Sequence, residues 1–180
     1  MSSRNVNLVI VCEDIQQLTF ARRYLIERGF ERRKFREELP RRGKGSGEQF
    51  VRQQLVAEVR EHRRKSYQKE RTVVVFIDAD TLSVQERLAQ LNSALEQEGL
   101  EKIQPDEKIA IFIPKRNIET WIRYANDHSA DETVSYPKLP KPRTCQAEVE
   151  LYVNSICKAG LPDDALSSLV HACGELAKIL

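Results

Sequence analysis

Two aspartates follow a run of apolar residues in the segment TVVVFIDADTLS, at positions 72–83. The apolar residues 73–77 read as a strand buried on both faces, and the chain then places Asp78 and Asp80 two residues apart. Like charges held this close repel each other unless a cation neutralises them. The pair therefore predicts either a plain strand-to-helix turn or a site for a divalent cation.

Acidic residues also follow two other apolar runs. Glu13 and Asp14 come directly after the run 6–12, and Glu119 lies shortly after the run 108–114. Ligands of parallel sheets bind beyond the carboxyl ends of the strands, so we expect these acids to meet the aspartate pair at one edge. Clustered carboxylate oxygens suit Mg²⁺ or Mn²⁺, which complete their shells with water and phosphate.

Three of the acids have simpler interpretations that stay open. Asp80 can begin a turn, and Asp14 can be the N-cap of the following helix. Glu119 can be a first-turn acid that the helix dipole favours.

The elements that must position these acids alternate between strand and helix. The segment 29–37, with Phe30 and Phe35, is compatible with a short edge strand. Helices are predicted over 16–28, about 48–66, 83–98, a short segment capped by Asn117, 144–159 and the C-terminal end. This order predicts an α/β domain with a mostly parallel sheet flanked by helices. We expect the domain over 1–126, a Pro-rich loop over 127–143 and C-terminal helices over 144–180 packed on the domain.

The net charge of +2 conceals two oppositely charged parts of the chain. Residues 22–71 carry a net charge of +9 and the remainder carries −7. A basic segment attracts polyanions, so we expect nucleic acid as a partner, although interleaved glutamates leave a salt-bridged surface as the alternative. The loop RRGKGSG adds flexible backbone N–H groups for phosphate, without matching a Walker loop. The candidate nucleic-acid-binding residues are Arg41, Arg42, Lys44, Lys115 and Arg116.

The cysteine pattern and the lengths of the apolar runs indicate the cellular compartment that we expect for the protein. The four cysteines form no C-x-x-C pair, and we expect all four to be reduced packing residues in a cytoplasmic protein. No apolar run reaches the roughly 18 residues of a membrane span, and MSSRNVN has no signal-peptide pattern. We therefore expect no membrane partner.

The order of these motifs resembles the Toprim domain of topoisomerases, primases and overcoming-lysogenization-defect nucleases. There an acid follows the first strand, as in LVIVCED, and a D-x-D follows a later strand, as in VVFIDAD. Small bacterial Toprim-like proteins, several from phage-defence contexts, are more similar still. Their Gly-Lys-rich loop and their P-x-x-x-I-E-x-W segment correspond here to GKGSGEQFVRQQL (43–55) and IPKRNIETWI (113–122). The resemblance covers about residues 6–126.

This resemblance implies a Toprim or Rossmann-like fold and a Mg²⁺- or Mn²⁺-dependent nuclease, or another phosphodiester-processing protein, with a role in bacterial defence. It implies that Glu13, Asp78 and Asp80 bind the metal and take part in catalysis. Glu119 corresponds to a later glutamate of the family and is a further catalytic candidate.

Two positions depart from the family pattern and support other functions. Asp14 stands where a glycine is usual, and Gln17 stands where the small relatives often carry another acid. The first alternative is a catalytically weakened binding or regulatory subunit, with a protein partner or as a homodimer. The second is a receiver-like phosphoacceptor domain, in which Glu13 and Asp14, Asp78 and Lys115 supply the acid pair, the acceptor and the lysine.

Overall fold

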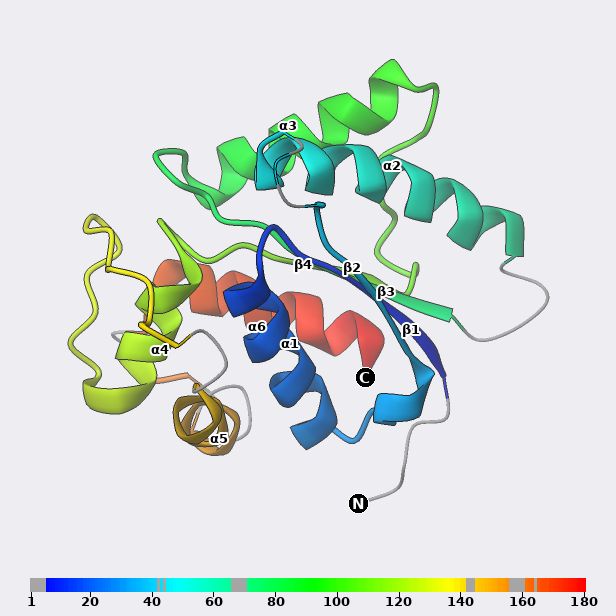
Figure 1. Ribbon diagram of the computed structural model, residues 1–180. Helices are drawn as coiled ribbons and strands as arrows, with labels where there is room; N and C mark the ends of the chain where they lie inside the picture. Colours follow the sequence, from blue (N-terminus) through cyan, green and yellow to red (C-terminus); the bar gives the residue numbers. More distant parts are fainter. Residues whose placement is uncertain are drawn as a thin grey trace.

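The computed structural model describes residues 6–41, 43, 45–65, 71–141, 145–155, 161–163 and 165–180. Within these residues one sheet of four parallel strands is covered by helices on both faces (Figure 1). The predicted α/β fold with a parallel sheet flanked by helices is therefore confirmed. The elements are β1 (Asn7–Val11), α1 (Ile15–Glu27), the 3-10 turn η1 (Arg32–Lys34), β2 (Phe35–Glu38), α2 (Gly47–Lys65), β3 (Arg71–Phe76), α3 (Val84–Gln97), β4 (Ile109–Phe112), α4 (Ile118–Asp127), α5 (Gln146–Ser155) and α6 (Ser167–Ile179).

The strand order β2-β1-β3-β4 creates a switch point between β1 and β3. The chain runs from β1 through α1 to β2 on one side, and then returns through α2 to β3 on the other side of β1. The helices α1 and α2 lie on opposite faces of the sheet (Figure 1). The carboxyl ends of β1 and β3 flank this switch point, which is where open α/β sheets bind ligands.

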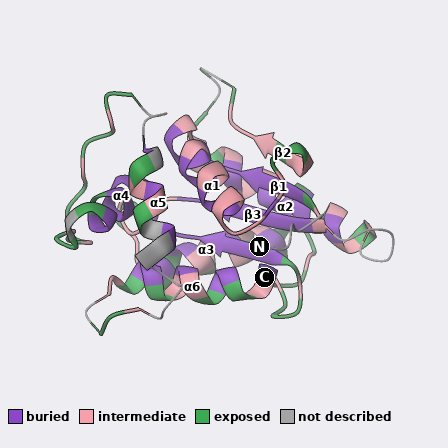
Figure 2. Ribbon diagram, turned by 90° about the horizontal axis from the view of Figure 1, so that it is seen from below, coloured by how far each residue is buried: buried purple, intermediate pink, exposed green. Residues whose placement is uncertain are grey.

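Side chains alternate between two apolar layers because successive strand residues point to opposite faces. One layer packs against α1, α4, α5 and α6, and the other packs against α2 and α3. Figure 2 shows β1 and β3 as almost continuously buried, which is typical of a parallel sheet with both faces covered, whereas the edge strand β2 is mostly half-buried. The strand residues of the first layer are Leu8, Ile10, Val74, Phe76, Ala110 and Phe112, and those of the second are Val9, Val11, Val73, Val75, Ile109 and Ile111.

Helix α6 covers the outer edge of β4. Glu175 Oε2 accepts a hydrogen bond from the Ile111 N–H at 2.8 Å, and His171 Nε2 lies 2.9 Å from the Ile111 carbonyl oxygen. Two helix side chains thus bond the backbone groups of Ile111 in place of a neighbouring strand. An edge strand without such partners exposes unpaired backbone groups, so α6 closes this side of the sheet.

Several local predictions can be compared with the structure residue by residue. Ser83 and Glu86 form the predicted capping box at the start of α3. The segment 29–37 becomes a strand only from Phe35 onward, after the 3-10 turn. Asn117 occupies the N-cap position of α4 but accepts no backbone capping hydrogen bond; its Oδ1 accepts from the Thr120 hydroxyl at 3.3 Å, and its Nδ2 donates to the Tyr136 carbonyl. The predicted cap Thr144 lies outside the described residues.

The cysteines only partly follow the expectation from sequence. Cys12 and Cys145 are buried thiols that are not disulfide-bonded. Cys173 is disulfide-bonded, so the expectation of a reduced thiol is wrong there. Spacing along the chain does not show which cysteines meet, because the packing of helices decides it. Cys157 lies outside the described residues.

No helix of the described residues is a candidate for a membrane span. Every helix of the described ranges is too short or too polar to cross a bilayer.

The contact between α6 and β4 predicts a specific loss of stability. Glu175→Ala leaves the buried Ile111 N–H without an acceptor, so we expect the free energy of unfolding to fall by about 2 kcal/mol. Glu175→Gln keeps an acceptor oxygen and should lose clearly less. Urea unfolding measures both, with the exposed Glu96→Ala on α3 as a control that changes stability by less than about 0.5 kcal/mol. Equal losses in all three variants would contradict this role of Glu175.

Candidate functional site

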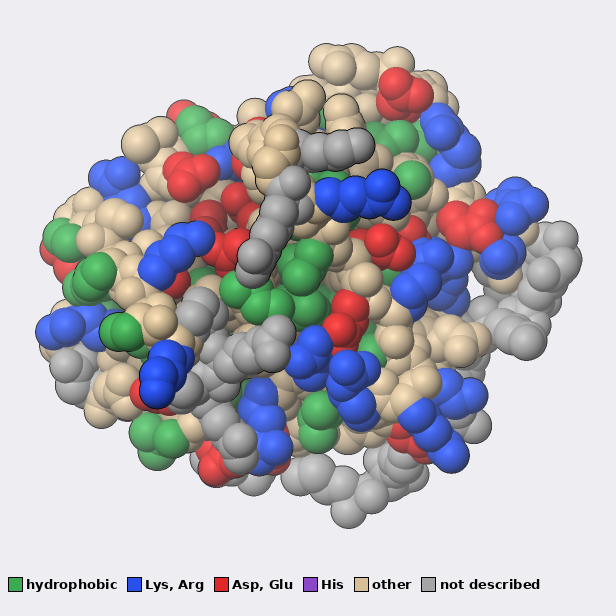
Figure 3. Space-filling view, in the orientation of Figure 1, with side chains coloured by type: hydrophobic (Ala, Val, Ile, Leu, Met, Phe, Trp, Pro, Cys, Tyr) green, Lys and Arg blue, Asp and Glu red, His purple; other side chains and the backbone are tan. Residues whose placement is uncertain are grey.

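The residues that follow β1, β3 and β4 meet at the switch point. Glu13 Oε1 accepts a hydrogen bond from the Asp78 N–H at 2.6 Å, so the acid after β1 touches the segment after β3. The charges of Glu13, Asp14 and Glu119 all act on Asp78. Figure 3 shows acidic side chains gathered over these strand-exit loops. We call Glu13, Asp14, Asp78 and Glu119 the carboxylate cluster.

The environment of the carboxylate cluster favours protonated carboxyl groups. Burial first, and then the charges of Asp80 and Asp14, raise the pKa of Glu13 to about 7, although the Asp78 N–H and Arg87 oppose the rise. Burial and the charge of Glu13 raise the pKa of Asp78 well above its usual range. Burial also raises the pKa of Glu119. A cation bound among these groups would relieve both the repulsion and the lost hydration.

Two oxygens of the carboxylate cluster have no hydrogen-bond partner. Asp78 Oδ1 and Glu119 Oε1 are both buried and unpaired, and Glu119 is only 3% exposed. A buried carboxylate oxygen without a partner costs free energy, because it has lost its hydration. Each of these two oxygens is therefore suited to coordinate a cation. No three His, Cys, Asp or Glu side chains in the described ranges lie close enough together in this conformation to hold a metal ion. The all-oxygen donor set nevertheless fits Mg²⁺ or Mn²⁺ in chemical type.

Asp14 is a helix cap as well as a member of the carboxylate cluster. Its Oδ1 accepts hydrogen bonds from the N–H groups of Gln16 and Gln17, both at 2.9 Å, which confirms the simpler interpretation of this residue. Its Oδ2 is ion-paired with Lys138, which comes from the Pro-rich loop. The Lys138 charge also partly opposes the rise that burial causes in the pKa of Glu119. A cation from a distant part of the chain therefore stands beside the cluster.

Asp80 has a different environment from Asp78, despite the D-x-D spacing. Its side chain is 60% exposed and ion-paired with Arg87 at 3.1 Å. Asp80 has φ +54°, and its N–H donates to the carbonyl of Arg116, which has φ +67°. Two joined residues in the left-handed region cost about 1–3 kcal/mol each, and such strain is concentrated at functional sites.

Helix α2 begins directly against Glu13. A Cβ atom on Gly47 would lie 2.8 Å from the Glu13 carbonyl oxygen and 2.9 Å from its Cβ, so only glycine fits this contact. Ser46 Oγ accepts from the Gln49 N–H at 3.1 Å and caps the helix. The end of the glycine-rich loop is therefore part of the site, and a helix N-terminus of this kind favours anions.

The predicted nucleic-acid-binding residues are placed unevenly. Arg41 is exposed, and neither Arg41 nor Arg116 has a carboxylate within ion-pair distance among the residues that the structure describes. Lys115 donates to the Leu82 carbonyl. Arg42 and Lys44 lie outside the described residues.

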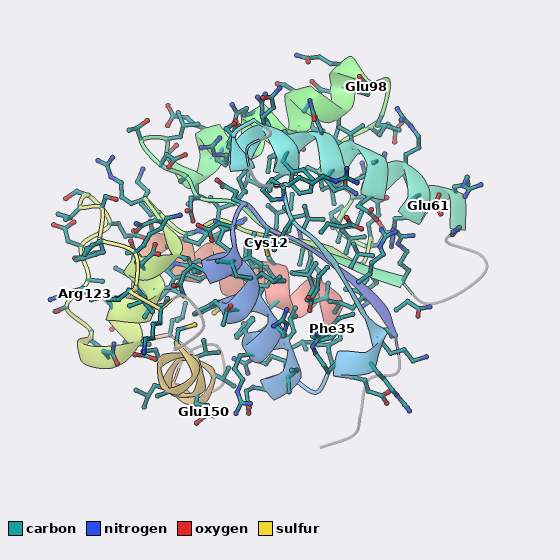
Figure 4. The ribbon with its side chains drawn as sticks, in the orientation of Figure 1. Cys12, Phe35, Glu61, Glu98, Arg123 and Glu150 are labelled. Atoms are coloured by element: carbon teal, nitrogen blue, oxygen red, sulfur yellow. The ribbon has the colours of Figure 1, made fainter. Side chains whose placement is uncertain are left out.

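Most described basic side chains of the segment 22–71 are ion-paired, so the salt-bridged alternative holds for much of it. Glu61 and Glu98, labelled in Figure 4 near the ends of α2 and α3, pair with Arg64 and Arg60. Basic and acidic side chains alternate over this part of Figure 3. The paired basic residues are Arg22, Arg23, Arg32, Arg33, Arg36, Arg52, Arg60, Arg63, Arg64, Lys65 and Arg71.

Three residues of the site were not found from the sequence as contributors to it. Gln17 is buried, its Oε1 accepts from the Glu13 N–H at 2.9 Å, and its amide partly opposes the rise in the pKa of Asp78 without reaching hydrogen-bond geometry. Lys138 came from a segment that reads only as a loop. Arg87 had a signal, since it falls on the apolar face of α3 between Val84 and Leu91, where a charge needs a buried partner.

No protein-family profile, no curated protein and no solved structure matches the chain. The resemblance to Toprim domains therefore stays a prediction, and the geometry of the site carries the functional argument.

The packing of Gly47 predicts a site-specific effect of one methyl group. Gly47→Ala forces Glu13 and α2 apart, so we expect the protein to lose about 1–3 kcal/mol of stability, although alanine normally favours a helix. Gly174→Ala is the matched control, because nothing lies within 4 Å of that added Cβ in α6 and it should stabilise by about 0.5–1 kcal/mol. Thermal unfolding measures both changes, and a stabilising Gly47→Ala would contradict the close contact.

The raised pKa of Glu13 predicts a pH dependence with a definite sign. The folded state resists ionisation of Glu13, so its contribution lowers the free energy of unfolding as pH rises from about 4.5 to about 7. We expect a loss on the order of 2 kcal/mol across this range, without divalent cations. Urea unfolding from pH 5 to pH 8 in EDTA measures it. Glu13→Gln should flatten the curve, and an unchanged slope in this variant would disprove the assignment.

Proposed function

We propose that the chain is a Mg²⁺- or Mn²⁺-dependent enzyme that cleaves phosphodiester bonds of nucleic acid. The observation that carries this proposal is the carboxylate cluster at the switch point, where two buried carboxylate oxygens have no partner. Both its position in the sheet and its oxygen donors are typical of a divalent cation site that serves phosphate chemistry. The resemblance to Toprim-like proteins leads to the same proposal and adds a role in bacterial defence.

The residues of the site have separate tasks in this proposal. A bound divalent cation supplies Lewis-acid stabilisation of a phosphoryl oxygen and lowers the pKa of water. Asp78 and Glu119 hold the cation through their unpaired oxygens, together with Glu13. Gln17 and Gly47 keep Glu13 in place from its two sides.

Phosphate binding is assigned to groups at the same edge of the sheet. The N-terminus of α2 favours an anion next to Glu13. Arg41 follows β2, and Lys115 and Arg116 follow β4, so all three lie on loops that leave the carboxyl ends of strands. Contacts of this kind bind the sugar-phosphate backbone without reading the bases.

A non-catalytic binding or regulatory subunit is the second candidate. The ion pairing of the basic segment favours it, because few of the described basic side chains remain for a phosphate backbone. The neutral Gln17 beside Asp78 points in the same direction. The receiver-like function gains no such support, since Lys115 donates to the Leu82 carbonyl, and no hydrogen bond or ion pair between Lys115 and Asp78 is found among the described residues.

Cleavage assays distinguish these functions. We expect the purified protein to cut labelled single- or double-stranded DNA or RNA with Mg²⁺ or Mn²⁺, and to lose at least about a hundredfold in rate in Asp78→Asn and in Glu119→Gln. Asp106→Asn is the matched control, because Asp106 is an exposed acid of the loop before β4, at the opposite end of that strand. It should cleave at the wild-type rate.

Two outcomes would count against the enzyme. Cleavage that persists unchanged in Asp78→Asn and Glu119→Gln would place the activity elsewhere. Binding of Mn²⁺ by the wild-type protein without cleavage of any substrate would favour the regulatory subunit.

A further inference from the structure

Arg87 is a buried cation at the border of the candidate site. Only 3% of the residue is exposed. Its Nη1 donates to Glu48 Oε1 at 3.0 Å, in the first turn of α2. Its Nη2 donates to Asp80 Oδ2 at 3.1 Å and to the Ala79 carbonyl at 3.3 Å. A buried guanidinium requires such partners, because an uncompensated charge in the interior is costly. Arg87 therefore joins the start of α2 to the loop after β3.

Asp80 is ion-paired with Arg87, whereas the two unpaired oxygens of the carboxylate cluster belong to other acids. Those oxygens belong to Asp78 and Glu119. The charges that act on Asp78 come from Glu13, Asp14 and Glu119, whereas Asp80 acts on Glu13. A cation that enters at the unpaired oxygens thus finds Asp80 already occupied by an ion pair.

We propose that Arg87 is the resident counter-ion of Asp80 and withholds this carboxylate from a divalent cation held by Asp78 and Glu119. Asp80 is then a positioning residue, and Arg87 sets the affinity of the site for its cation. The inference rests on the cation site of the proposed function. It goes beyond that function because it gives different roles to Asp78 and Asp80, which the D-x-D spacing alone makes equivalent.

The physical consequence concerns charge as well as geometry. Loss of Arg87 removes a positive charge near the site and releases a carboxylate that can turn toward the cation. At the effective dielectric constant of about 20 that applies near protein surfaces, one unit charge at short range changes cation affinity by about tenfold or more. A residue that only supports the fold would weaken cation binding when it is removed. A counter-ion that competes for Asp80 would strengthen it.

Isothermal titration of the full chain with MnCl₂ tests this difference, with thermal melts to monitor folding. We expect Arg87→Gln to bind Mn²⁺ about tenfold more tightly than the wild type, and Arg87→Lys, which keeps the charge, to stay within about threefold. Asp78→Asn should lose measurable binding, whereas Asp80→Asn should weaken it by about tenfold, because a charge but no ligand oxygen is lost. In the Arg87→Gln background Asp80→Asn should weaken it by about a hundredfold, because Asp80 has become available as a ligand there.

Arg52→Gln is the matched control for these variants. Arg52 Nε contacts the same Glu48 carboxylate at 2.7 Å. Its ion pair is with Glu48 alone, so its removal should leave Mn²⁺ affinity unchanged. The Asp80→Asn variant keeps Arg87. Its Mn²⁺ affinity therefore tests the proposal even where Arg87→Gln does not fold.

The outcomes separate this inference from the function on which it rests. Weaker Mn²⁺ binding by a folded Arg87→Gln, or an Asp80→Asn variant as impaired as Asp78→Asn, would overturn the role of Arg87. The same holds if Arg87→Gln behaves like Arg52→Gln. A wild-type protein that binds no Mn²⁺ would refute the cation site itself, and the role of Arg87 with it.

Discussion

The contact between the Glu13 carboxylate and the Asp78 N–H is the interaction on which the candidate site depends. It joins the exits of two adjacent parallel strands, whose register pairs Val11 with Val75. The two acids repel each other, and burial raises the pKa of both. Such an arrangement persists only when its surroundings fix it, and here the buried sheet supplies a rigid base. The strain and repulsion of the site are therefore supported by the stability of the core.

Neighbouring segments add to this constraint from several directions. Gly47 places the start of α2 against Glu13, and Gln17 bonds the Glu13 N–H from α1. Arg87 holds the loop after β3 to the first turn of α2. Each of these contacts is local to the carboxyl edge, yet they come from three different helices. A change in any one helix is therefore transmitted to the same pair of acids.

The Pro-rich loop connects the site with the C-terminal helices. The Glu132 carboxylate accepts hydrogen bonds from the N–H groups of Ser167 and Ser168 and so caps α6, which has no cap of its own. The Tyr136 carbonyl accepts from Asn117 at the start of α4, and Lys138 pairs with Asp14. Arg123, labelled in Figure 4, lies over the Tyr136 ring at 5.1 Å. Through Glu132, Tyr136 and Lys138, this loop thus connects α4, α6 and the carboxylate cluster.

The sequence by itself determined the α/β order, the three buried strands and the acids at their ends. These features follow from local patterns, because apolar runs, capping residues and turn residues act over a few positions. Most helix bounds agree with the structure to within one or two residues for the same reason. The charge asymmetry was also visible, but its meaning was not, since charge counts do not show which arginines are paired.

Only the tertiary structure decided which of the acids form one site. Strand order and register bring Glu13 against Asp78, and the packing of α3 on α2 delivers Arg87 to Asp80. The partner of Asp14 is 124 residues away along the chain. Interactions over such separations depend on the assembled core, because the energy that places them comes from burying the apolar layers and not from the residues of the site. The D-x-D spacing suggested one pair of equivalent aspartates, but the fold gives Asp78 and Asp80 different surroundings.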